Sequence, residues 1–110
     1  MQIKKEKIES LGLRFSARDE ADGEAGRAFL YILKNDLHNR PFGFIEDVFV
    51  DEKYRGQGIG TDLVKAMIEE AKANDCYKLI LTSRYEKPKV HALYEKIGFK
   101  DHGKEFRLDF

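Results

Sequence analysis

The chain has 110 residues, 42% of them hydrophobic and 36% charged, which predicts one globular domain spanning residues 1–110 with one modest core. Lysine plus arginine and aspartate plus glutamate number 20 each, so no net field favours nucleic acid or an anionic membrane as a partner. No apolar run has the length of a transmembrane helix, and the N-terminus lacks the apolar region of a signal peptide. The single cysteine, Cys76, excludes an internal disulfide and leads us to expect a protein of the reducing cytoplasm.

The first half of the chain is rich in strand patterns. Residues 1–9 are either a first strand or a loose lead-in. The turn-forming cluster Asp19–Glu24, with Gly23 at its tip, predicts a hairpin between two strands, and the polar loop Asn35–Pro41 closes a second hairpin. The expected strands, in chain order, are Leu11–Phe15, Gly26–Lys34 and Phe44–Val50.

The third of these strands ends at a conspicuous turn. Strict alternation would direct Phe44, Glu46, Val48 and Val50 to one face of the sheet and Ile45, Asp47 and Phe49 to the other. The turn Asp51–Lys53 breaks the apolar pattern, and Tyr54 beside it is assigned to packing.

The second half alternates helix and strand. A helix is predicted from Ile59 to Asn74, with Asn74 as a left-handed cap and an apolar stripe of Leu63, Val64, Met67, Ile68 and Ala71. A short buried strand, Tyr77–Thr82, should lie parallel to the central strand because a helix joins the two. A second helix, Pro88–Ile97, should end at Gly98, and Phe106–Phe110 alternates like a last strand. The fold class is therefore α/β, with a mixed sheet.

A glycine-rich turn connects the central strand to the first helix. Its sequence is Arg55-Gly-Gln-Gly-Ile-Gly60. Helix N-termini present N–H groups without internal partners at the positive end of the helix dipole, glycines let a ligand approach the backbone, and Arg55 supplies a cation. The unit predicts an anion site. A P-loop is excluded because Thr61-Asp62 follows in place of Lys-Ser/Thr, and the G-x-G-x-G spacing does not fit a dinucleotide-binding fingerprint.

This turn resembles the pyrophosphate-binding loop, R/Q-x-x-G-x-G/A, of the GNAT family of N-acetyltransferases. Arg55, Gly58 and Gly60 occupy the motif positions. Two more segments are similar to the family, namely the strand Ile45–Val50 and the segment His91–Phe99, which carries Tyr94 and Gly-Phe. The resemblance covers about residues 11 to 110.

The resemblance implies that acetyl-CoA is the acyl donor and that a small-molecule or peptide amine is the acceptor. It implies a GNAT-like fold in which the central strand splays from its parallel neighbour, so that its backbone holds the acyl arm. The implied cofactor-binding residues are Val48, Phe49 and Val50 for the acyl arm, and Arg55, Gly56, Gln57, Gly58, Ile59, Gly60 and Thr61 for the pyrophosphate.

Acetyl transfer to an amine needs a base and an acid. An amine with a pKa near ~10.4 loses its proton at pH 7 at a cost of about 4–5 kcal/mol, and a carboxylate can help. Glu46 is the candidate base, because apolar neighbours on its strand face would desolvate it; the alternative is a solvent-facing glutamate. Tyr94, at the position of the family tyrosine, is the candidate acid for the leaving thiolate; the alternative is a core tyrosine.

The sequence departs from the family in two places. No helical pattern precedes the first hairpin, where the resemblance implies helices that form one wall of the acceptor site. A partner subunit could supply that wall, and a homodimer could cover the apolar surface left exposed. Glu86-Lys87 stands where many members carry a cofactor-binding asparagine. These departures keep open an alternative function, a non-catalytic CoA-binding or regulatory module. The three histidines show no metal-ligand spacing, so no metal site is expected. The sequence leaves the acceptor open.

Overall fold

The computed structural model describes residues 1–110, which form two compact units, Met1–Ile80 and Leu81–Phe110. The first unit contains, in chain order, β1 (Leu11–Arg18), β2 (Glu24–Leu33), β3 (Phe42–Val50), the 3₁₀ turn η1 (Glu52–Tyr54), α1 (Ile59–Ala73) and β4 (Leu79–Ile80). The second contains α2 (Pro88–Ile97). Residues 1–10 form neither helix nor strand, so they are a loose lead-in. Neither helix combines the length and the apolar character needed to cross a bilayer.

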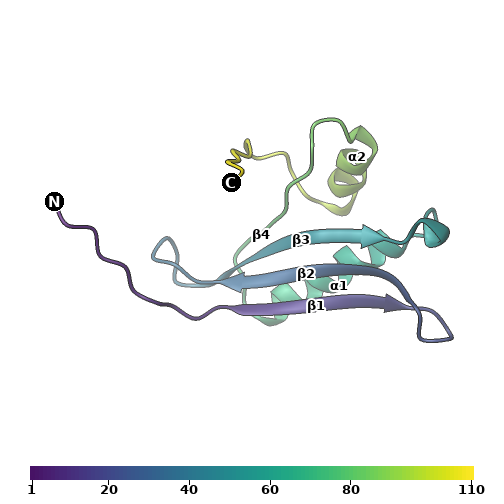
Figure 1. The fold of residues 1–110 in the computed structure, drawn as a ribbon, viewed down its shortest axis with the longest axis horizontal. Coiled ribbons are helices and arrows are strands. Elements are labelled where there is room, and N and C mark those ends of the chain that lie inside the picture. The colour runs from purple at the N-terminus through teal and green to yellow at the C-terminus, as the bar shows by residue number, and fades with distance from the viewer. The chain divides into compact units, whose positions relative to one another are not determined.

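One mixed sheet organises the first unit. Its strands follow the order β1-β2-β3-β4, with antiparallel pairing between the first three and parallel pairing between β3 and β4. Figure 1 shows the three long strands side by side, with α1 crossing behind one face. The mixed α/β sheet predicted from the sequence is confirmed.

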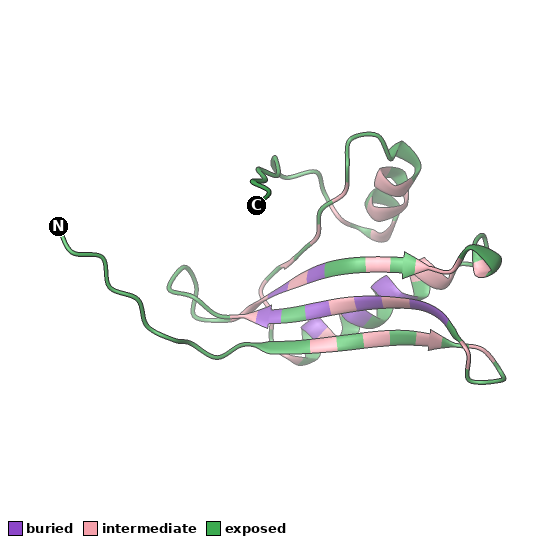
Figure 2. Ribbon diagram, viewed as in Figure 1, coloured by how far each residue is buried: buried purple, intermediate pink, exposed green.

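The core lies between α1 and the sheet. Four large side chains are fully buried, Leu30 on β2, Ile45 on β3, and Val64 and Met67 on α1. Figure 2 shows the buried residues gathered on β2, on the first half of β3 and on α1. The predicted helix stripe is thus the face that packs on the sheet, since helical spacing brings those positions to one side.

A bulge in β3 changes the predicted alternation. Phe29 pairs with Glu46, but Arg27 pairs with Phe49, so β3 has one extra residue in this interval. Asp47, in the bulge, has φ +53°. Phe49 therefore returns to the face of Glu46, and Val50, paired with Gly26, turns toward α1. The predicted grouping of Val50 with Glu46 is wrong, because strict alternation fails across a bulge.

Two predictions about the end of α1 and the strand after it are also corrected. The left-handed residue is Asp75, with φ +59°, whereas Asn74 has φ −93° and caps the Glu70 carbonyl with its side-chain amide. The strand expected over Tyr77–Thr82 is reduced to Leu79 and Ile80, and Ile80 is exposed. Only Gly43–Leu79 and Phe44–Ile80 pair, so β3 lacks a parallel neighbour from Ile45 onward.

The second unit contains one helix with both predicted ends. Pro88 occupies its first turn, and Gly98 follows it with φ +127°, a conformation that favours glycine. The strand predicted at Phe106–Phe110 is absent. Alternating apolar residues form a strand only where another strand supplies hydrogen-bond partners, and no strand of this unit does so.

Candidate functional site

The glycine turn leaves the start of α1 without a side-chain cap. Gly58 is the N-cap residue, with φ +81°, and Gly56 has φ +79°. Both conformations favour glycine, and nothing lies within 4 Å of the Cβ position at either residue. No side chain bonds to the first N–H groups of the helix. The result is a run of accessible donors at the positive end of a 15-residue helix, which suits a phosphate.

Arg55 provides the cation next to these donors. Its Nε donates to the Val50 carbonyl at 3.0 Å, and its Cζ lies 5.9 Å from the centre of the Phe49 ring. The ion pairs of the first unit use other basic side chains. The guanidinium of Arg55 is therefore exposed and anchored at one nitrogen, and its remaining N–H groups can meet a bound anion.

The remaining predicted phosphate-site residues continue into the helix. Gln57 is exposed, and Ile59, Gly60 and Thr61 are half-buried in the first turn of α1. A Cβ at Gly60 would lie 3.6 Å from Val50 Cγ2. The helix therefore begins directly against the end of β3, and this contact brings the predicted acyl-arm segment next to the predicted phosphate segment.

The other face of β3 carries Glu46. This carboxylate is exposed and shares its face with Phe44, Phe49 and the paired residues of β2. Glu46 is exposed although its face carries apolar neighbours, since the bulge brings Phe49 to this face and turns Val50 to the other. Val48 is half-buried, and Phe49 is 41% exposed. The structure thus splits the predicted acyl-arm residues between two faces of the strand.

Asp47 forms an ion pair with Arg27. Arg27 binds it through Nε at 2.9 Å and through its terminal nitrogen at 3.2 Å, and the same guanidinium lies 4.7 Å from the centre of the Phe49 ring. This hydrogen-bonded pair holds the pKa of Asp47 below its ordinary value. Because Arg27 lies on the face of Phe49, Asp47 does not point away from Glu46 as alternation predicts. Of the two carboxylates, Glu46 is the one without an arginine partner on β2.

Tyr94 belongs to the second unit. Its ring meets Phe99 edge-on at 6.0 Å, and burial raises the pKa of its hydroxyl above the ordinary value. A protonated phenol is what a general acid at neutral pH requires. Its catalytic role stays a prediction.

Two residues that support the candidate site were not identified from the sequence. Arg27 supports Phe49 and Asp47 across the bulge, and its pairing depends on a register that alternation does not reveal. Tyr54 is more than packing, since its hydroxyl donates a hydrogen bond to Asp19, 35 residues earlier. The position of Tyr54 next to Arg55 was the available signal, but its partner could be found only in three dimensions.

Comparison with known proteins agrees with the fold. The acetyltransferase (GNAT) family model matches residues 12–99. A solved structure, described as a putative acetyltransferase from Agrobacterium tumefaciens, superposes with a TM-score of 0.83 at 34% identity, covering 90% of this chain and 69% of that one. The fold described above is thus that of solved acetyltransferase structures. The chain belongs to the GNAT acetyltransferase family.

Curated relatives include enzymes with different acceptors. Glucosamine 6-phosphate N-acetyltransferase of Trypanosoma brucei brucei is 44% identical over 70 residues, which are 64% of this chain and 46% of the relative. Human N-alpha-acetyltransferase 30 is 37% identical over 78 residues, which are 69% of this chain and 22% of the relative. The chain thus spans about half or less of the length of these relatives.

Proposed function

We propose that this chain binds acetyl-CoA at the glycine turn and transfers the acetyl group directly to a primary amine. The observation that carries the proposal is the start of α1, where two left-handed glycines and no side-chain cap leave backbone N–H groups accessible beside Arg55. The pyrophosphate of acetyl-CoA is an anion of the charge and size that such a helix start and an arginine can hold together.

The transfer needs two proton movements at residues of this chain. The amine nitrogen attacks the thioester carbonyl carbon, a C–N bond forms and the C–S bond breaks. Glu46 takes the proton of the amine, directly or through water, and Tyr94 gives its phenolic proton to the departing thiolate. Backbone N–H groups of β3 beyond Phe44, where pairing with β4 has ended, would bind the carbonyl oxygen as its negative charge develops.

The acceptor proposed first is an amino-sugar phosphate. The support is the 44% identity to a protein named glucosamine 6-phosphate N-acetyltransferase. A protein N-terminus is the second candidate, supported by the 37% identity to human N-alpha-acetyltransferase 30. Both acceptors present a primary amine, so the proposed roles of Glu46 and Tyr94 are the same for either.

Calorimetric titration with acetyl-CoA tests the donor site. We expect wild-type binding with a Kd on the order of micromolar, and loss of binding in an Arg55→Glu, Gly58→Glu variant, which places two negative charges at the turn. The matched control is Lys53→Glu, Gly103→Glu, which makes the same change in charge at exposed positions outside the turn, and it should bind like the wild type. Gly58 has a positive φ, so its replacement by glutamate also strains the backbone. Arg55→Gln removes the positive charge without that strain and provides a second test. Wild-type protein that does not bind would refute the donor site.

Release of CoA thiol then separates the enzyme from a binding module. With acetyl-CoA and glucosamine 6-phosphate, or a peptide with a free N-terminus, thiol should appear in step with the acetylated amine. A non-catalytic CoA-binding module would bind acetyl-CoA with the same dependence on Arg55 and release no thiol with either acceptor.

A further inference from the structure

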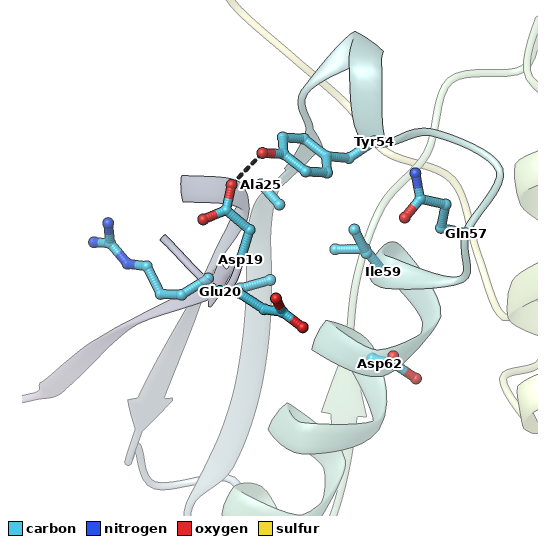
Figure 3. Close-up of a pocket in the computed structure, with 9 residues that line it drawn as sticks. Asp19, Glu20, Ala25, Tyr54, Gln57, Ile59 and Asp62 are labelled. Carbon is cyan, nitrogen blue, oxygen red and sulfur yellow. Dashed lines mark hydrogen bonds between the residues drawn. The ribbon is translucent and has the colours of Figure 1, made fainter. Parts of the chain in front are cut away.

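A hydrogen bond joins the first hairpin to the segment before the glycine turn. The hydroxyl of Tyr54, the last residue of η1, donates to Oδ2 of Asp19 in the β1–β2 turn. Figure 3 shows this contact at the wall of a pocket of about 380 Å³, whose other labelled residues are Glu20, Ala25, Gln57, Ile59 and Asp62. The bond is half-buried, and it spans 35 residues of sequence.

The β1–β2 turn holds the carboxylate of Asp19 in place. Asp19 Oδ1 accepts the N–H groups of Gly23 at 2.7 Å and Ala21 at 3.0 Å. The backbone closes the same turn, since Asp19 N–H donates to the Gly23 carbonyl at 2.9 Å and Asp22 N–H donates to the Asp19 carbonyl at 2.9 Å. With both oxygens engaged, the carboxylate is a fixed point on the hairpin and not a mobile surface group.

The two partners keep complementary protonation states over the neutral range. The Tyr54 hydroxyl, followed by the turn N–H groups, lowers the pKa of Asp19 below its usual range. The same hydrogen bond raises the pKa of Tyr54. Asp19 therefore stays an acceptor and Tyr54 stays a donor at any pH from about 5 to about 9.

Tyr54 and Arg55 are the last two side chains anchored before the glycines. η1 is fixed at its start, because Asp51 N–H donates to the Ala25 carbonyl at 2.8 Å, and the Asp51 carboxylate accepts the N–H of Lys53 at 3.2 Å. Beyond Arg55, Gly56 and Gly58 have no side chains, and Gln57 is exposed. The direction in which the chain enters the glycine turn is therefore set by the contacts of η1, Tyr54 and Arg55.

We propose that Asp19 and Tyr54 are positioning residues that hold Arg55 and the N–H groups of the glycine turn in place for the pyrophosphate of the acyl donor. The inference rests on the proposed function. It assigns to the β1–β2 hairpin, which carries none of the predicted donor-binding residues, a part in donor affinity. The pair acts through the turn and does not touch the reacting atoms.

Steady-state kinetics with acetyl-CoA and glucosamine 6-phosphate test the positioning role. Tyr54→Phe, Asp19→Asn and the double variant should each raise the KM for acetyl-CoA about tenfold, with kcat within about twofold of the wild type. The double variant should be no worse than either single variant, because both remove one interaction. Tyr77→Phe is the matched control. Tyr77 is also half-buried, and no hydrogen bond to its hydroxyl is present in the first unit. A purely structural role would lower kcat through loss of folded enzyme and leave KM unchanged, and that result would overturn the proposal.

Limited trypsin digestion without any ligand tests the same idea independently of acetyl-CoA. Cleavage after Arg55 should be severalfold faster in Tyr54→Phe than in the wild type, while cleavage after Lys34 in the β2–β3 loop stays the same. Equal rates after Arg55 would overturn the positioning of the turn. If cleavage accelerates but KM is unchanged, the pair orders the turn without serving the donor, and the proposal is wrong. If the wild type does not bind acetyl-CoA, the proposed function fails and the role toward the donor fails with it, while the digestion still reports on the turn.

Discussion

Two adjacent carboxylates on β3 have different surroundings. Asp47 is held by both nitrogens of the Arg27 fork, whereas Glu46 is exposed on the same face without a partner on β2. An arginine-bound carboxylate is a poor base because protonation would break two charge-assisted hydrogen bonds. Of the two, Glu46 is therefore the one we propose as the base.

Replacing Glu46 tests its proposed role as base. Glu46→Gln keeps the size of the side chain and removes its basicity, so kcat should fall about 10²-fold. The Kd for acetyl-CoA, measured by calorimetry, should stay the same. Glu69→Gln on the solvent side of α1 is the control and should retain full activity. Unchanged turnover in Glu46→Gln at every pH would assign the base to another group.

Tyr94 leads to a prediction about alkaline pH. Because burial raises the pKa of Tyr94, its hydroxyl stays protonated up to and beyond pH 10. This group favours the folded state below pH 10, and that contribution is lost as the pH rises through the folded-state pKa. Turnover should hold through pH 9 and fall above about 10. Tyr94→Phe should lower kcat at all pH values, while Tyr85→Phe, an exposed tyrosine of the same unit, should match the wild type.

Among the elements, the contact between β2, β3 and α1 is the tightest part of the candidate site. A Cβ at Gly26 would lie 2.9 Å from the Phe49 carbonyl oxygen and 3.2 Å from Ile59 Cγ2. Backbone cannot move aside as a flexible side chain can, so the end of β3 and the start of α1 would have to separate. The absence of a side chain at Gly26 therefore allows the end of β3 and the glycine turn before α1 to lie together.

Gly26→Ala should therefore weaken both stability and donor binding. We expect a loss of about 1–3 kcal/mol in the free energy of unfolding, measured by urea denaturation, and weaker acetyl-CoA binding by calorimetry. Gly12→Ala is the matched control, because its Cβ would meet only the Tyr31 ring, at 3.4 Å. If Gly26→Ala binds acetyl-CoA as tightly as the wild type, the spacing at this contact does not matter to the donor.

The accuracy of the sequence-based predictions also differs by element. α1 and α2 were predicted almost to the residue, because helical periodicity, Pro88 and Gly98 are local signals. The bulge at Asp47 was not predicted, since an extra residue between the partners of Arg27 and Phe29 depends on pairing with another strand. For the same reason the strand expected at Phe106–Phe110 failed. The motif located the glycine turn, whereas the Asp19–Tyr54 bond needed contacts between segments distant in sequence.

For the whole molecule, we propose a homodimer. Phe106, Leu108 and Phe110 are 91%, 78% and 114% exposed, and association with a second copy would remove apolar surface from water. Sedimentation equilibrium should report about 26 kDa, twice the chain mass of 12.8 kDa. Serine at all three positions should shift the protein to monomer, whereas Leu37→Ser, at another exposed leucine, should not. A wild-type monomer at high concentration would contradict the dimer.

Under the proposed function, the missing cap at the start of α1 would couple the stability of the fold to the supply of acetyl-CoA. A side-chain cap is worth about 0.5–2 kcal/mol, and this helix does without one. Under the proposed function, the phosphates of acetyl-CoA bind the N–H groups that a cap would otherwise bind. Acetyl-CoA present at about 100 times its Kd would add about 2.7 kcal/mol to the stability of the folded state, because it binds only the folded chain. Proteases act on the unfolded or opened chain, so the lifetime of the protein would lengthen when acetyl-CoA is plentiful and shorten when it is scarce. Abundance would then follow the supply of the substrate without a separate regulator.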